Sequence, residues 1–71
     1  MVEIKASMAG TVLTILVEQG QEVQVGQDVT ILESMKMEIP VECQSNGTVQ
    51  EVKVVIGDFV NEGDVLIVLS V

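Results

Sequence analysis

The sequence predicts an all-β fold: a flattened barrel, or sandwich, of two four-stranded antiparallel sheets related by an approximate internal two-fold. Three observations predict it. The 71-residue chain is rich in Val, Ile and Leu and has one aromatic residue, a composition that suits strands packed face to face. Apolar and polar residues alternate over short segments, and no helical period is long enough to compete. Finally, the second half of the chain repeats the first.

Residues 10–34 align with residues 47–71 without a gap, at an offset of 37. Eight aligned positions are identical, and three of these are glycines. Glycines at matching positions indicate the same turns in both halves, because glycine tolerates tight bends and positive φ. The duplication predicts two equivalent halves that form one domain over residues 1–71.

Turn residues divide the first half into strands. Residues 2–6 supply an opening strand, and the β-branched run at 11–17 predicts the next, which ends at the glycine turn of residues 18–21. A short strand at 22–23 lies between that turn and a second glycine turn. The apolar run at 28–33 then predicts the last strand of this half.

The second half is expected to follow the same plan. Residues 37–42 supply its opening strand, and the run Ser45-Asn46-Gly47 is a strong turn signal. The repeat and the glycine positions place the remaining strands. These cover residues 49–56, 59–60 and 65–70.

Alternation in the strand over 49–56 predicts which side chains face the core. Val52, Val54 and Ile56 form the inward set, because charged residues occupy positions between them. The repeat makes Ile15 and Val17 inward in the first half. The last strand of each half is apolar on both faces near its end. A single inward–outward alternation of side chains does not fit this pattern, which indicates a β-bulge.

Composition excludes several classes of partner. A formal net charge of −8 repels nucleic acid phosphates and anionic membranes. No run approaches the roughly 20 apolar residues of a membrane span, and the N-terminus lacks the basic start and apolar core of a signal peptide. A single cysteine, Cys43, is compatible with a reducing compartment. We therefore expect a cytoplasmic monomer that binds neither nucleic acid nor membranes.

The residue inventory argues against an independent enzyme. The chain has no Arg and no His, so it lacks a bidentate phosphate clamp and a neutral-pH proton shuttle. It has no Gly-rich phosphate loop and no acidic cluster with the spacing of a metal site. Phe59, the one aromatic residue, is expected to fill the core or its rim. The chain is thus expected to serve chemistry done elsewhere.

Lys36 is the candidate functional residue. It has 35 residues on either side and is one of three lysines. The repeat places it in the hairpin between the strands at 28–33 and 37–42, at the end of the sandwich away from both termini. That hairpin lacks the Asn-Gly or Asp-Gly of ordinary tight turns, and a broken local rule is typical of functional sites.

Two methionines, Met35 and Met37, flank this lysine. Exposed methionines would suit a soft contact for a partner that grips the tip. The alternative is that both are core residues and that Lys36 is an ordinary solvated lysine. Lys5 and Lys53 have no comparable setting and are expected to be outward strand charges.

Met35-Lys36-Met37 resembles the Met-Lys-Met attachment sequence of biotinyl domains, the biotin carboxyl carrier family. The resemblance covers essentially the whole chain, and chains of this size are similar to the small stand-alone biotin/lipoyl attachment proteins. The other segments that resemble the family pattern are residues 6–10, 26–27, 32–38 and 39–40.

The resemblance implies a carrier. A biotin protein ligase would join biotin to the amine of Lys36, and the attached group would carry carboxylate between the biotin carboxylase and carboxyltransferase components of a biotin-dependent carboxylase. Met35 and Met37 would contribute to recognition of the tip. Ser34 stands where the family usually has Ala, close enough to the tip to affect that recognition.

Two acidic residues close to the tip are further candidates. Glu33 and Glu38 would face each other across the hairpin if Met35 and Lys36 are its turn residues. We hypothesise that both serve recognition by the ligase. The alternative is that both are solvated strand ends.

Two other functions stay open. Lipoyl domains share the fold and a hairpin lysine, but their lysine usually follows Asp in Asp-Lys-Ala-like runs, so methionine on both sides favours biotin. Acceptance of both groups is conceivable and would add lipoyl-attaching enzymes to the partners. The second alternative is a non-carrier interaction module that kept the fold, for which Lys36→Ala would leave physiology unchanged.

Overall fold

The computed structural model describes residues 1–71 and consists of strands, turns and bends. It contains no helix that could cross a membrane. All the expected strands are present, and the predicted fold class is confirmed. In chain order the strands are β1 (Val2–Lys5), β2 (Gly10–Ile15), β3 (Glu22–Val23), β4 (Asp28–Ser34), β5 (Met37–Glu42), β6 (Gly47–Val52), β7 (Phe59–Val60) and β8 (Val65–Ser70).

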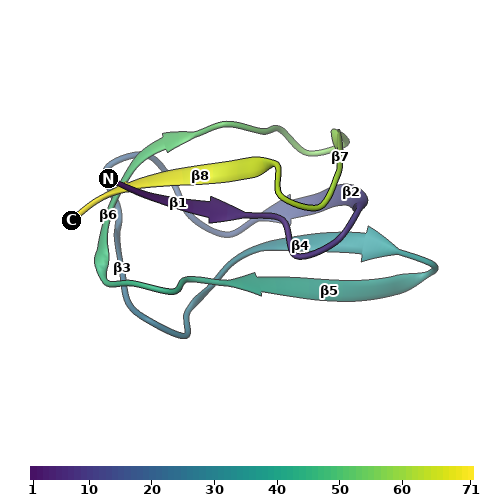
Figure 1. The fold of residues 1–71 in the computed structure, drawn as a ribbon, viewed down its shortest axis with the longest axis horizontal. Coiled ribbons are helices and arrows are strands. Elements are labelled where there is room, and N and C mark those ends of the chain that lie inside the picture. Colours follow the sequence, from purple (N-terminus) through teal and green to yellow (C-terminus); the bar gives the residue numbers. More distant parts are fainter.

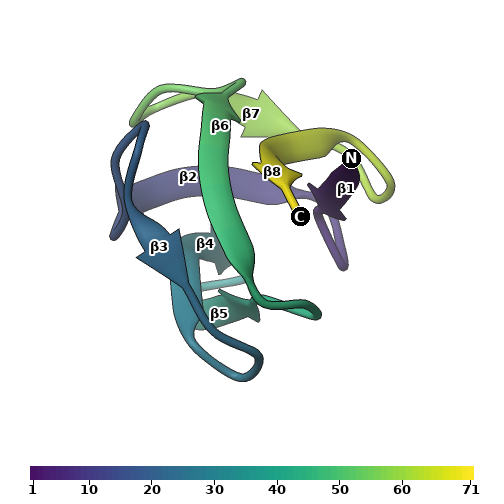
Figure 2. The same ribbon diagram turned by 90° about the vertical axis from the view of Figure 1, so that its left-hand side faces the viewer.

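The strands form two four-stranded antiparallel sheets, shown in Figures 1 and 2. The first sheet has the order β1-β8-β6-β3 and the second the order β5-β4-β2-β7. The sequence repeat maps each strand of one sheet onto a strand of the other. The short strands are exchanged between halves, because β3 pairs with β6 and β7 pairs with β2. This exchange ties the two halves of the chain together.

Bulges are present in four strands and follow the repeat; the sequence predicted those of β4 and β8 but not those of β2 and β6. Leu13 in β2 and Gln50 in β6 are extra residues at equivalent positions in their ladders. Val29 in β4 and Leu66 in β8 form the second equivalent pair. A bulge lets two consecutive residues face the same side, which explains why Val29 and Thr30 are both fully buried. These bulges account for the strands that fitted no single alternation.

The core lies between the two sheets and is built almost entirely from Val, Leu and Ile. Thr30 is its one buried polar side chain, and its hydroxyl donates to the carbonyl of Thr14 at 2.6 Å. Every buried polar side-chain atom has a hydrogen-bond partner, so burial leaves no uncompensated polar group. The largest fully buried side chains are Leu32, Leu66, Ile67 and Leu69.

The strand predicted over 49–56 is shorter than expected, because β6 ends at Val52. The chain then leaves the sheet and forms a turn in which the Val55 amide donates to Oδ2 of Asp58 at 2.9 Å. The prediction that Ile56 faces inward is therefore wrong: its side chain is 64% exposed. The alternation continues past the end of β6 as far as Val54 and fails at Ile56, which lies in the turn.

The other inward predictions are confirmed. Val17 is buried, and Ile15, Val52 and Val54 pack against the core. The strand predicted over 11–17 also ends early, at Ile15. Phe59 is not in the core: it is 67% exposed on β7.

The molecule is elongated, with extents of 33 × 19 × 18 Å. The β4–β5 hairpin projects at one end, and both termini lie together at the other (Figure 1). Val2 pairs with Leu69, so the beginning and end of the chain lie side by side in one sheet. By the repeat, this terminal end is the counterpart of the hairpin. Lys36 lies at the hairpin tip, as predicted.

Candidate functional site

The hairpin that carries Lys36 closes with a two-residue turn. Ser34 and Met37 form the last register pair, which leaves Met35 and Lys36 as the turn residues. Their φ angles are 53° and 65°, and no other residue except glycine has a positive φ. Two consecutive positive φ angles are the mark of a type I′ turn, which normally contains Asn-Gly or Asp-Gly. The tip therefore adopts a tight-turn conformation with residues that disfavour it.

This turn is strained, and the ladder below it must hold it in place. A side chain in the left-handed region costs about 1 kcal/mol or more per residue when it is neither Gly, Asn nor Asp. The β4–β5 ladder pairs residues from Asp28/Glu42 to Ser34/Met37. A hairpin held so firmly presents Lys36 in one backbone conformation at the far end of the molecule.

The turn strain makes a testable prediction about Met35. Met35→Asn is expected to raise the free energy of unfolding by about 0.5–1 kcal/mol, because Asn tolerates a positive φ. The gain should appear as a higher midpoint in urea or thermal unfolding. Met37→Asn is the matched control, since Met37 lies in strand β5, where Asn is disfavoured. Equal loss of stability in both variants would contradict the strained turn.

The side chains at the tip are fully in contact with solvent. Met35 is 88% exposed and Met37 is 59% exposed, which excludes the interpretation that they are core residues. Lys36 is exposed and makes no ion pair; the structure's ion pair joins Lys53 to Glu51 at 3.1 Å. Its amine is therefore free to react, and the methionines offer a polarizable apolar contact on either side of it.

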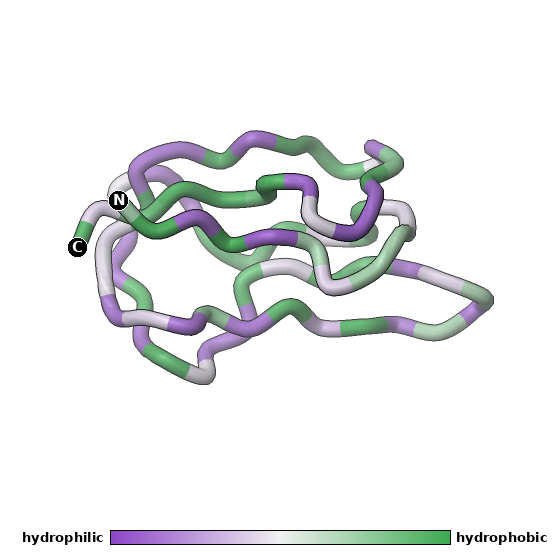
Figure 3. Tube along the Cα trace, viewed as in Figure 1, coloured by the Kyte–Doolittle hydropathy of each residue, from purple (hydrophilic) through white to green (hydrophobic).

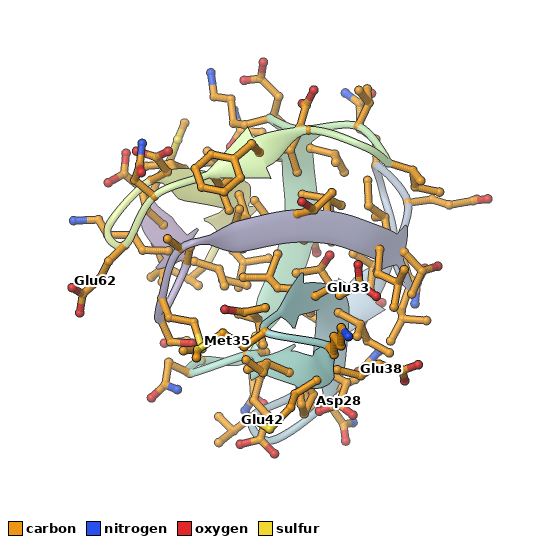
Figure 4. The ribbon with its side chains drawn as sticks, turned by 90° about the vertical axis from the view of Figure 1, so that its right-hand side faces the viewer. Asp28, Glu33, Met35, Glu38, Glu42 and Glu62 are labelled. Atoms are coloured by element: carbon orange, nitrogen blue, oxygen red, sulfur yellow. The ribbon has the colours of Figure 1, made fainter.

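The two carboxylates near the tip face each other, as predicted. Glu33 and Glu38 form a register pair and are both exposed. Figure 4 shows them on the same side of the hairpin. Ser34, half-buried, pairs with Met37 one step closer to the tip. The structure thus brings together the whole predicted set, residues 33–38.

Sequence reasoning missed four residues near this set. Asp28 and Glu42 form a second carboxylate pair at the base of the hairpin (Figure 4). Phe59 lies in the same row as the first pair, because it pairs with Thr11, which pairs with Glu33. Only the pairing of β7 with β2 reveals this row, and the two-residue strand β7 gives little local signal of its partner.

The fourth missed residue, Gly10, lies beneath the hairpin. A Cβ atom at this position would stand 2.7 Å from the carbonyl oxygen of Glu33. The backbone of β2 therefore approaches β4 more closely than any side chain would permit. Its φ is not positive, so here glycine is required for space. The matched glycines predicted a turn at Gly10 and Gly47, and this prediction is wrong for that pair: each begins a strand, β2 or β6.

No enclosed site surrounds Lys36. The two hollows on the surface are lined by other residues and include none from 33–38. No group of three or more metal-ligating side chains is present. The tip thus offers a reactive amine without the surroundings that would activate it. A partner has to supply the catalytic groups.

Fold and site together define a class of protein: a duplicated β sandwich that presents one lysine on a rigid hairpin to other proteins. The family model described as "Biotin-requiring enzyme" matches residues 2–69. The chain belongs to this biotin/lipoyl attachment family.

Known proteins similar to this chain support that membership. It is 52% identical to a biotin/lipoyl attachment protein of Bacillus subtilis (strain 168), over 94% of this chain and 92% of that one. It is 44% identical to the alpha subunit of mitochondrial methylcrotonoyl-CoA carboxylase of Arabidopsis thaliana, over 89% of this chain and 9% of that one. The crystal structure of Kluyveromyces lactis urea carboxylase superposes with a TM-score of 0.91 at 28% identity, covering 97% of this chain and 6% of that one.

Proposed function

We propose that the protein is a carrier that is biotinylated on Lys36 and moves carboxyl groups between the active sites of a biotin-dependent carboxylase. The observation that carries the proposal is the amine of Lys36, exposed and free of ion pairs on a strained hairpin tip. Family membership and the carboxylase relatives support biotin as the attached group. They also support a carrier role in place of an enzymatic one.

The residues at the tip suit covalent attachment. Lys36 would supply its amine as the nucleophile that forms an amide with the activated carboxyl group of biotin. The ligase must take the proton, because no side chain of the tip is placed as a base near that amine. Acylation removes the positive charge and makes an already acidic chain more acidic. Once attached, biotin supplies the nitrogen that accepts and releases carboxylate.

The partners follow from these roles. A biotin protein ligase would grip the exposed tip, with Met35 and Met37 as the apolar contacts. Biotin carboxylase and carboxyltransferase components would then use the loaded carrier in turn. We place the carrier in the cytoplasm, where a buried free thiol such as that of Cys43 is usual.

Intact mass spectrometry of the protein from its native host tests the proposal. Under biotin-replete conditions the mass is expected to show one biotinyl group, and peptide mapping should place it on Lys36. An unmodified Lys36 under these conditions would overturn the carrier role. Lipoate on Lys36 would keep the carrier and change its cargo, and a relative named for both attachments makes this the second candidate.

Charge reversal of Glu38 tests the proposed role of the carboxylates. Glu38→Lys is expected to stabilise the hairpin by a few tenths of a kcal/mol, because like charges opposite each other destabilise a sheet. If Glu33 and Glu38 are read by the ligase, the same change should lower kcat/KM of biotinylation by about tenfold, the effect of roughly 1.4 kcal/mol.

Glu42→Lys is the matched control for this prediction. Glu42 also pairs with a carboxylate, Asp28, but at the base of the hairpin. It should give the same gain in stability with unchanged biotinylation kinetics. Unchanged kinetics in Glu38→Lys as well would make Glu38 a solvated strand end.

A further inference from the structure

Exposed apolar side chains gather around β7, which lies in the same sheet as the hairpin and is separated from β4 by β2. Val55 and Ile56 are each 64% exposed, Phe59 is 67% exposed, and Leu13 is 37% exposed. We call these four residues the β7 patch. Figure 3 shows the stretch leading into β7 in the green of hydrophobic residues. Adjacent exposed apolar side chains are unusual on a soluble surface and mark contact sites.

The patch is one surface, because the turn that carries it is fastened to β2. The amide of Gly57 donates to the carbonyl of Val12, and the amide of Val12 donates to the carbonyl of Asp58, both at 2.8 Å. These bonds hold the turn of residues 55–58 against Val12, the residue that precedes Leu13. Phe59 follows at the start of β7 and pairs with Thr11 in the same strand β2.

The internal repeat supplies a control for this patch. The repeat counterparts of Leu13, Val55, Ile56 and Phe59 are, in that order, Gln50, Glu18, Gln19 and Glu22. All four counterparts are polar or charged. The backbone is the same in both places. In the first half the Glu18 amide donates to Oε1 of Gln21 at 3.1 Å, just as the Val55 amide donates to Asp58. The fold therefore does not require apolar residues in the patch.

Phe59, which belongs to the patch, lies in the same sheet as the hairpin that carries Lys36. On the sheet that carries Lys36, a row of paired residues runs from Phe59 through Thr11 and Glu33 to Glu38. The equivalent row on the other sheet starts at Glu22 and ends at Ser70, beside the termini. The row that begins at the apolar Phe59 leads to the hairpin, whereas the row that begins at the charged Glu22 leads to the termini.

Three exposed apolar residues outside the patch also have polar or charged counterparts in the repeat: Leu16, Val25 and Val71, which correspond to Lys53, Glu62 and Ser34. Val25 is 62% exposed, and its counterpart is Glu62. Val25 stands between Gln24 and Gly26 in a turn, with no exposed apolar residue next to it in the chain. Single exposed apolar residues are normal. Val25 therefore serves as a control, not as a second patch.

We propose that the β7 patch docks on a subunit of the carboxylase that uses the loaded carrier, in an apolar socket rimmed by basic side chains. This rests on the proposed carrier function. Exposed acidic residues flank the patch: Asp58 lies within its turn, and Glu33 lies along the row to the tip. A basic rim complements them. A second copy of this chain, with its net charge of −8, does not.

The size of an interface points to the same partner. A stable contact buries about 800 Å² on each side, more than a two-residue turn can supply. An enzyme that draws the tip into its active site therefore needs a contact on the body of the carrier. A few apolar side chains give such a contact without making it permanent, and a shuttle has to release each active site in turn.

In-cell photo-crosslinking tests which partner occupies the patch. Benzoylphenylalanine at position 59, in the protein expressed in its native host, is expected to crosslink to a carboxylase subunit identified by mass spectrometry. The matched control places it at position 22, the repeat equivalent, and should give no such product. Crosslinking to the ligase or to a second copy, or to no carboxylase subunit, would overturn the proposal.

A charge-neutral variant tests whether the contact matters. Val55→Gln/Ile56→Gln/Phe59→Gln keeps the net charge and uses residues compatible with the equivalent turn of the first half. With the captured carboxylase, KM for the biotinylated carrier is expected to rise about tenfold or more, while biotinylation by the ligase changes less than twofold. Val25→Gln should leave both unchanged. An unchanged KM in the triple variant would overturn the docking role.

The two proposals fail differently in these experiments. If wild-type protein carries no biotin, the carrier function itself is wrong. If the triple variant is biotinylated normally and its KM is also normal, the carrier function stands and only the docking surface is wrong. Circular dichroism and unfolding of the triple variant show whether it is folded, and the crosslinking result does not depend on that variant.

Discussion

Lys36→Arg is expected to abolish covalent modification and leave the fold intact. Arginine keeps the positive charge and a long flexible stem, but its guanidinium does not lose a proton in proteins and offers no free amine for an amide bond. Lys36 is exposed and unpaired, so its replacement should change the free energy of unfolding by less than about 0.5 kcal/mol. The measurement is intact mass after incubation with ligase, ATP and biotin, beside an unfolding curve.

The chain contains its own controls for this experiment. Lys5 and Lys53 are exposed lysines on the same protein, so Lys5→Arg and Lys53→Arg should be modified at the wild-type rate. Arginine keeps the positive charge, so Lys53→Arg can retain the ion pair with Glu51, a surface pair that should contribute little to stability. Modification that persists in Lys36→Arg would place the attachment site elsewhere.

Much of the fold was predictable because the sequence repeats. Gly20 and Gly57, and Gly26 and Gly63, all have a positive φ, so matching glycines marked matching turns. The ends of β2 and β6 were not predictable. Each leaves its sheet where tertiary hydrogen bonds take over, such as the bond from the Gly57 amide to the carbonyl of Val12. Local alternation carries no information about such bonds.

The tip was predictable in position and only partly in conformation. The midpoint of a duplicated chain placed Lys36 opposite the termini, and the missing turn formers indicated that the hairpin was unusual. That Met35 and Lys36 would both take a positive φ depended on the register of the β4–β5 ladder. A shift of one residue in that register would have produced a three-residue loop, which uses a different turn type.

Phe59 shows why the surface was harder to predict than the core. A lone aromatic residue in an apolar chain is expected inside, and a two-residue strand is too short for alternation to say otherwise. A signal was nevertheless present: its counterpart in the first half is Glu22, and a position that accepts Glu in the same fold is a surface position. Matched positions of the repeat specify the core and turns, whereas mismatched positions show where the halves differ in function.

Gly10→Ala is the prediction with the largest expected effect on stability, about 2–3 kcal/mol, because the added Cβ would overpack two strands. It would lie 2.7 Å from the carbonyl oxygen of Glu33, and backbone atoms of a paired strand cannot rotate away. At roughly 4–8 °C per kcal/mol for a small domain, thermal unfolding should show the loss clearly.

Gly47→Ala is the matched comparison, since the repeat makes Gly47 the counterpart of Gly10. There the added Cβ would meet the carbonyl oxygen of Ser70 and Cγ1 of Val71, both at 2.9 Å. The carbonyl contact is longer than the 2.7 Å at Gly10, and Cγ1 of Val71 belongs to an exposed side chain that can rotate away. Gly47→Ala should therefore destabilise less than Gly10→Ala. It should also leave biotinylation unchanged, whereas Gly10→Ala displaces the base of the hairpin and should slow it. Equal effects of the two substitutions on biotinylation would show that the ligase does not depend on how β2 supports the hairpin.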